Sequence, residues 1–342
     1  MVAKAGGLRQ TEEEGFAKAW FGEARSPMVK KIIELIILII MFHLFLIPAG
    51  LLASSLGPSG GLTVSGKYGA DDFLAIGPPP GLYLINYSFF YSANKFKDYN
   101  GDEIKNGPFE NFKMRVAGNI IRPIYVSKKK IFGSFWGMDM GIPLIDKHIE
   151  SRYFDDGDSG LGDIILCPLW LAWHTEVFHF LLSFDVVTPT GRYDKNDLVN
   201  IGNNHWTFEP LFSVTAVLPG GFDLNVNLLY DINWKNNDFI DPRTMKETTY
   251  RAGQAFHADY AFGYEIMRNQ RIGVVGYYWK DITDDKIGGQ EISDSRGQVF
   301  SFGPAYSLNW NKVIISLKTQ FETAVKNRPQ GTMSWLRILY TF

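Results

Sequence analysis

Strict alternation of apolar and polar residues over long stretches dominates the chain after residue 80 and restricts its fold more than any other feature. Residues 221–234 show the pattern most clearly, with Phe222 and Leu224 alternating with Asp223 and Asn225. Side chains of a β-strand point alternately to opposite faces, so such a segment has one apolar and one polar face. We therefore expect a protein built almost entirely of half-buried strands.

The segment 175–188 repeats the alternation, so each of its side chains can be assigned to one of two sides. We expect one side to contact lipid and the other to line the interior of the fold. The first side holds Phe178, Phe180, Leu182 and Phe184. The second holds His179, Ser183 and Asp185.

About twelve segments can be read in this way. They are 82–93, 111–126, 131–146, 161–174, 175–188, 203–217, 221–234, 248–265, 270–281, 296–309, 311–325 and 332–342. Strands of soluble sandwiches usually have ~5–6 residues, whereas a strand that crosses a bilayer obliquely needs ~9–11. Tight turns at 219–220 and 309–311 alternate with long polar loops at 94–110, 189–202, 235–247 and 282–295. The pattern favours an all-β transmembrane antiparallel barrel of about twelve strands, closed by pairing of its first and last strands, over a soluble sandwich.

The N-terminal region has the layout of a secretory signal peptide. Residues 32–47 are an apolar run, preceded by Lys30 and Lys31 and followed by small residues that end at Ser55. An uncleaved anchor helix is the alternative, but it would need ~20 apolar residues. We expect four parts: 1–27, a start miscall or N-terminal extension; 28–55, the signal peptide; 56–80, a periplasmic or plug segment; and 81–342, the barrel.

Composition excludes several classes of protein. The 34 Lys and Arg nearly balance the 36 Asp and Glu, which argues against a nucleic-acid partner. The single cysteine, Cys167, excludes an intramolecular disulfide and a Cys-rich metal site. We expect no cofactor.

The final strand carries an aromatic ending. Ile338, Tyr340 and Phe342 share one face with Leu336, which is typical of the signal read by the outer-membrane assembly machinery. Tryptophans at strand ends suit the aromatic girdles at the two membrane interfaces. These tryptophans are Trp206, Trp234, Trp279 and Trp310.

Several short motifs between Pro78 and Phe342 occur in a characteristic order. They are PPPGLYLINYSFFYSA (78–93), DYNGD (98–102), SGLGDI (159–164), PTGRYD (189–194), NIGNNHWTFEP (200–210) and YRAG (250–253) followed by His257 and Asp259. In these motifs the chain resembles the family of outer-membrane channels assigned to the phenol meta-degradation pathway. The resemblance implies a monomeric barrel of about twelve strands in a Gram-negative outer membrane. It also implies admission of small hydrophobic or aromatic compounds.

Three patterns suggest chemistry but are better explained otherwise. The sequence His-Thr-Glu-Val-Phe-His at 174–179 places its histidines five apart on strand-like segments, so we expect them to point in opposite directions and to bind no zinc. The acidic residues at 155–158 lack the closing Glu of a calcium loop, which favours a solvated surface loop. A barrel lipid hydrolase would need a histidine beside a serine, and no such pattern is convincing. We expect no enzyme.

Polar residues of the predicted strands are candidates for the lumen lining. They are Lys113, Arg115, His179, Asp185, Glu209, Asp223, Arg251, His257, Asp259, Lys318, Glu322 and Arg337. Both signs of charge are present, which suits small neutral or weakly polar solutes better than acidic oligosaccharides. Alternatively, these charges pair with one another and stabilise a hydrated barrel wall without selecting a solute. The expected function is a channel for small hydrophobic or aromatic molecules, and the alternative is a structural or adhesive barrel with a plugged lumen.

Overall fold

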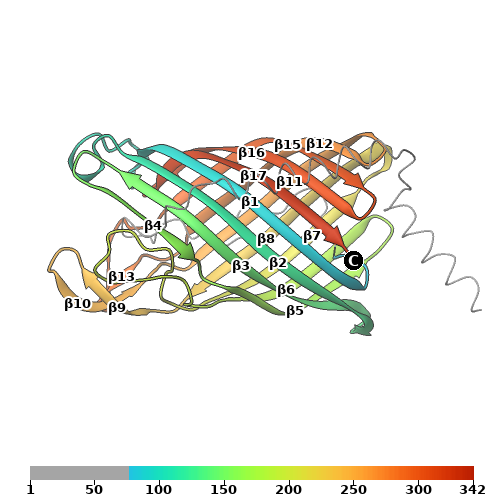
Figure 1. The fold of residues 1–342 in the computed structure, drawn as a ribbon, viewed down its shortest axis with the longest axis horizontal. Coiled ribbons are helices and arrows are strands. Elements are labelled where there is room, and N and C mark those ends of the chain that lie inside the picture. The colour runs from blue at the N-terminus through green and yellow to red at the C-terminus, as the bar shows by residue number, and fades with distance from the viewer. Residues whose placement is uncertain (1–76) are drawn as a thin grey trace, which may run out of the picture.

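The computed structural model describes residues 77–342, in which thirteen strands form one antiparallel sheet that closes into a barrel (Figure 1). β4 (Asp155–Leu161) and β5 (Ile165–His174) lie end to end along β3 (Ser134–Glu150), so the wall has twelve strands. The other wall strands are β1 (Gly81–Phe96), β2 (Lys113–Ile131), β6 (Phe178–Val187), β7 (Thr207–Val217), β8 (Phe222–Asn233), β11 (Ala255–Met267), β12 (Gln270–Asp281), β15 (Gln298–Trp310), β16 (Val313–Lys326) and β17 (Pro329–Thr341). β1 pairs with β17 from Tyr83 opposite Thr341 to Phe96 opposite Pro329, which closes the barrel. The predicted fold class and strand number are confirmed.

The two ends of the barrel differ in their connections. At one end, hereafter the turn end, short turns join consecutive strands and the C-terminus lies beside them (Figure 1). Two of these turns use left-handed residues, Gly133 with φ 74° and Asn311 with φ 56°, as tight hairpin connections require. The turn at Gly133 also explains why β3 begins three residues later than predicted. At the other end, hereafter the loop end, lie the long connections 97–112, 188–206, 234–254 and 282–297.

A second, small sheet is built from these long connections. It consists of β9 (Asn236–Asp241), β10 (Lys246–Arg251), β13 (Lys286–Ile287) and β14 (Gln290–Glu291), and it projects beyond the wall at the loop end (Figure 1). The predicted single strand 248–265 is therefore wrong, because residues 252–254 are not in a strand and separate β10 from β11. At this break a Cβ on Gly253 would lie 2.2 Å from the carbonyl oxygen of Thr283. The short 3-10 turns η1 (Gly107–Phe109) and η2 (Pro219–Gly221) complete the described elements.

Burial alternates along the wall strands as the sequence does. In β8, Asp223 and Asn227 are at most 1% exposed, whereas Leu224 is 44% and Leu228 40% exposed. In a closed barrel the buried face is the inward one, so the polar side chains of β8 line the interior and the apolar ones cover the outside.

Within residues 77–342, the structure holds no helix of the length and apolarity that crossing a membrane requires. The expected signal peptide at 28–55 and nearly all of the expected plug segment at 56–80 lie outside the described residues.

Candidate functional site

The interior face of β6, β7, β8 and β11 forms a polar wall. Among the residues expected in the lumen, six lie on it: His179, Asp185, Glu209, Asp223, His257 and Asp259. Each is at most 9% exposed. Uncharged polar groups fill the spaces between them, and Asn225 donates a hydrogen bond of 2.8 Å to the Thr215 hydroxyl. Charges buried in this way must be compensated by neighbouring polar groups.

The opposite interior face, on β1, β2 and β17, forms an apolar wall that the alternation rule did not predict. Its members Tyr87, Tyr91, Val116, Ile120 and Trp335 are at most 3% exposed and belong to one apolar cluster. The rings of Tyr87 and Trp335 pack in a T-shaped arrangement with their centroids 6.3 Å apart. The two walls together give the interior one side suited to apolar rings and one side rich in hydrogen-bonding groups.

Cationic groups lie at the edges of the apolar wall. Lys318 and Arg337, both expected in the lumen, place their charges 5.8 Å and 5.9 Å from the ring centroids of Trp335 and Tyr87. Such positions allow cation–π attraction. Arg122 of β2, which was not among the candidates, pairs with Asp139 of β3 at 2.8 Å.

Glu322 of β16 connects strands around the closing seam. Its carboxylate accepts hydrogen bonds from the Tyr91 hydroxyl (2.8 Å) and the Tyr277 hydroxyl (2.6 Å). It also accepts one from the backbone N–H of Gly331 at 2.7 Å. Glu322 therefore faces the interior, where it stabilises the arrangement of β1, β12, β16 and β17.

Three expected lumen residues lie elsewhere. Lys113 and Arg115 are exposed on the outer face of β2, because the intervening Met114 points inward with 2% exposure. Lys113 pairs there with Glu150 at 2.8 Å. Arg251 is exposed on β10, in the small sheet rather than in the wall. Near the loop end the outer face carries charges, so polarity alone does not identify the interior there.

A cluster of ionisable groups occupies the polar wall. His257 Nε2 lies 3.4 Å from Glu209 Oε2 and 3.3 Å from Asp231 Oδ1. The three side chains come from the adjacent strands β7, β8 and β11. Asp231 was not singled out from the sequence, although it alternates in phase with Asp223.

Two further clusters lie at the turn end. Arg271 binds Asp223 at 3.0 Å and Glu265 at 3.3 Å. His174 and His179 face one another with their Nδ1 atoms 3.1 Å apart. The expectation that these histidines point in opposite directions is wrong, because a hairpin turn separates them and makes them directly opposed residues of β5 and β6.

At the loop end a pocket opens between the barrel rim and the small sheet. Its aromatic lining includes Tyr193, Phe239, Tyr250 and Trp279, and its polar lining includes His205, Asp231, Asn233 and Asp281. Trp279 is 5% exposed and packs beneath the guanidinium of Arg328 at 4.0 Å. The interfacial position expected for Trp279 is therefore wrong.

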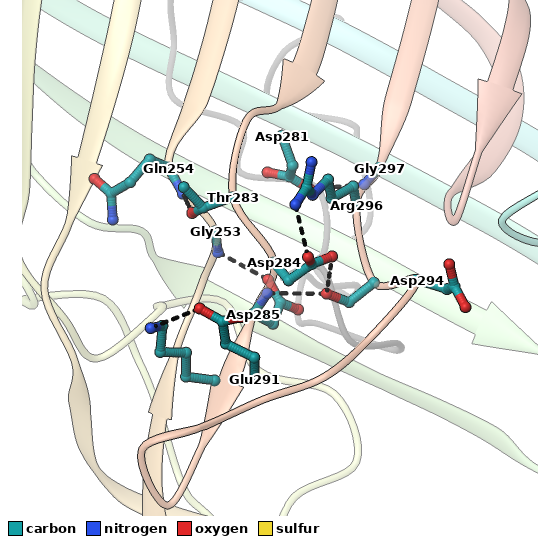
Figure 2. Close-up of polar contacts among 12 residues, drawn as sticks. Gly253, Gln254, Asp281, Thr283, Asp284, Asp285, Glu291, Asp294, Arg296 and Gly297 are labelled. Atoms are coloured by element: carbon teal, nitrogen blue, oxygen red, sulfur yellow. Dashed lines mark hydrogen bonds and ion pairs between the residues drawn. The ribbon is translucent and has the colours of Figure 1, made fainter.

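Carboxylates hold the loop 282–297 against this rim (Figure 2). Asp285 accepts hydrogen bonds from the N–H of Gly253 (2.8 Å) and the hydroxyl of Tyr250 (3.0 Å), and Asp281 accepts one from the N–H of Gly297 (2.8 Å). Burial raises the pKa of Asp285 to about 7, and these hydrogen bonds oppose the rise. The pocket rim is therefore a packed structure rather than an open loop.

Fold and interior together define a transmembrane β-barrel of the outer-membrane type with a two-sided lining. The family model described as "Putative MetA-pathway of phenol degradation" matches residues 93–338, and the chain belongs to this family. No curated protein sequence matches the chain.

Several solved structures align with the chain. An outer membrane channel from Pseudomonas putida F1 aligns with a TM-score of 0.68 and 17% identity, over 80% of this chain and 99% of that one. The KdgM porin in complex with disordered oligogalacturonate aligns with a TM-score of 0.39 and 9% identity, over 76% of this chain and 99% of that one. The translocator domain of the autotransporter NalP from Neisseria meningitidis aligns with a TM-score of 0.44 and 9% identity, over 77% and 89%. The first of these shows the common fold.

Proposed function

We propose that the protein is a passive outer-membrane channel that admits small hydrophobic or aromatic molecules. The observation that carries the proposal is the two-sided interior. Tyr87, Ile120 and Trp335 offer an apolar surface, and Asn225 and Asn227 offer hydrogen-bonding groups on the facing wall. A ring with a polar substituent could contact both walls at once. The family's description in terms of phenol degradation agrees with such a solute.

The proposed route begins at the loop end. Aromatic side chains of the pocket, among them Tyr193, Phe239 and Tyr250, would receive the solute between the rim and the small sheet. It would then pass along the apolar wall toward the turn end, with exit to the periplasm or laterally through the wall. This route requires no catalysis and no cofactor.

The proposal includes a cellular setting. The protein would be exported through the signal peptide at 28–55, inserted by the outer-membrane assembly machinery, and held as a monomer in the lipid bilayer. The exposed apolar side chains of the wall, such as Leu224 (44% exposed), Phe262 (48%) and Leu317 (50%), support contact with lipid.

Uptake by intact cells tests the channel function, because lipid vesicles are themselves permeable to small aromatics. Cells that express the protein should take up radiolabelled toluene faster than cells without it, at matched growth. Ile120→Gln should reduce this rate by placing an amide on the apolar wall. Ile121→Gln places the same amide on the outer face of the same strand, where Ile121 is 39% exposed, and as the matched control it should leave the rate per folded barrel unchanged. Uptake would be expressed per folded barrel, measured as the heat-modifiable band. Equal uptake with and without the protein would contradict the proposal.

A structural or adhesive barrel with a plugged lumen is the second candidate. It is favoured by the tight burial of interior charges, since Lys147, Asp185 and His257 are each 0% exposed. Planar-bilayer recordings separate the two functions. A channel gives discrete conductance steps, whereas a plugged barrel gives none although the folded protein is present.

A further inference from the structure

We propose that Glu209, Asp231 and His257 form a binding site for a divalent transition-metal ion, with Zn²⁺ as the best-fitting case. The site lies in the polar wall, and it is independent of the solute that the channel admits. Glu209, Asp231 and His257 are 1%, 5% and 0% exposed, so the cluster belongs to the interior rather than to a solvated surface. One carboxylate oxygen from each acid and one imidazole nitrogen lie within 4.8 Å of one another.

The distances from the imidazole nitrogen suit metal ligands, and the 3.3 Å contact with Asp231 is otherwise a long hydrogen bond. The imidazole nitrogen lies 3.3 Å and 3.4 Å from the two carboxylate oxygens. A charge-assisted hydrogen bond between such groups would be about 2.7–2.9 Å long. In contrast, ligands about 2.0–2.2 Å from a tetrahedral Zn²⁺ are roughly 3.3–3.5 Å from one another. The two separations from the imidazole nitrogen therefore match those of ligands around one such ion.

The backbone around Glu209 supports a fixed geometry. The register of β7 against β8 is the same on both sides of it, since Phe208 pairs with Ile232 and Leu211 pairs with Leu229. This register sets Glu209 directly opposite Asp231, with both side chains on the same face. Pro210, next to Glu209, has no N–H to donate to the ladder.

Charge balance also favours a divalent ion. His257 is the cationic partner that the described ion pairs give to both Glu209 and Asp231. A protonated imidazole supplies one positive charge to these two carboxylates. A divalent ion with a neutral imidazole would balance both carboxylates. Oxygen and imidazole ligands suit zinc, manganese and iron rather than soft ions.

The fourth coordination position would face the pocket at the loop end. Asp231 is shared between the cluster and the lining of that pocket, where His205 and Asn233 lie beside it. Three protein ligands and one exchangeable position are typical of zinc sites that bind water or a solute. The pocket would therefore supply both the path for the ion and the fourth ligand.

Zinc titration of the full-length protein, without a histidine tag and stripped with chelator, tests the site. Calorimetry with ZnCl₂ should show one ion per barrel. His257→Gln and Glu209→Gln should each weaken binding by more than about 100-fold, with the heat-modifiable band retained. Co²⁺ bound in place of Zn²⁺ should give the intense visible bands of a four-coordinate ion, and these bands should vanish in the same variants. If His257→Gln fails to fold, Glu209→Gln and Asp231→Asn carry the test.

His174→Gln is the matched control, because the His174–His179 pair at the turn end is a competing zinc ligand set (3.1 Å). His148→Gln, whose imidazole lies 2.6 Å from Asp155, is a second control. Both variants should bind zinc as the unaltered protein does. The proposal is overturned if the unaltered protein binds no stoichiometric zinc, or if binding survives in folded His257→Gln and Glu209→Gln. Loss of binding in His174→Gln would move the site to the turn end and equally overturn it.

Discussion

Two adjacent residues of β8 provide a direct test of the barrel's inside and outside. Leu228 is 40% exposed and lies opposite Phe212 and Ala258 on the neighbouring strands. Asn227 is 1% exposed and lies opposite Ser213 and Asp259. Because successive side chains point to opposite faces, Leu228→Arg places a charge in lipid and Asn227→Arg places the same charge in the lumen.

The expected magnitudes differ strongly. Arginine on the lipid face near the bilayer midplane costs about 2–4 kcal/mol. This corresponds to a change of roughly 30- to 700-fold in the folding equilibrium constant. Asn227→Arg instead places the charge on the polar wall opposite Asp259, so it should lower the free energy of unfolding by less than Leu228→Arg does.

Folding into lipid vesicles at increasing urea concentration measures both effects. The heat-modifiable band reports the folded fraction, and the intrinsic fluorescence of the 9 tryptophans follows insertion. Leu228→Arg should shift the midpoint to lower urea by more than Asn227→Arg does. Equal shifts, or a larger shift for Asn227→Arg, would show that the interior and exterior faces of β8 are not as described.

Four further outcomes are expected. Replacing Glu322 with Gln should lower the free energy of unfolding by about 1–3 kcal/mol, measured by urea titration, because the tyrosine hydroxyls that donate to its carboxylate lose a charged acceptor. Folded Asp285 holds its proton up to a pKa of about 7, so loop 282–297 should be most stable below about pH 4 and lose stability as pH rises to about 7. Hydrogen exchange corrected for intrinsic rates should show this slope, and Asp285→Asn should make it smaller. N-terminal sequencing of protein from outer-membrane fractions should begin after residue 55, and an intact Met1 or Met28 would contradict the signal-peptide assignment. Phe342→Ala should reduce the amount of heat-modifiable barrel without changing flux per folded molecule, because it removes an exposed ring that packs on Tyr340 (centroids 4.9 Å apart) at the end of the closing strand; normal abundance with altered flux would place Phe342 in the pore.

The strands were predictable because each has one face toward lipid and one face toward the barrel interior. A wall strand that meets lipid on one side and a polar interior on the other has to alternate, and the alternation is visible in the sequence of 221–234. The prediction failed where this constraint is absent. β10 lies beyond the wall, so no lipid-facing pattern separates it from β11, and its Arg251 was wrongly included in the lumen.

The composition of the interior was predictable only in part. Lys113 and Arg115 alternate with Met114 and Val116, but at the loop end the outer face also meets water, so the polar set can point outward. Proximity across a hairpin was missed as well, since His174 and His179 become neighbours only when the turn between them is recognised. The cluster around His257 depends on the register of three strands, which sequence spacing within any one strand does not contain.

The apolar wall lies at the seam where the barrel closes, and this location links transport to assembly. β1, β2 and β17 carry apolar residues on both faces, so Tyr87, Ile120 and Trp335 pack inside while Leu82 and Ile121 are exposed outside. Burial of the inner set stabilises the pairing of the first and last strands, which would otherwise leave backbone groups unsatisfied in lipid. The same side chains are the proposed contact surface for an apolar solute. A substitution on this wall therefore changes both the amount of closed barrel and the affinity of its lining. Flux measured per folded barrel separates the two effects, because assembly alters only the number of barrels and the lining alters the rate through each one.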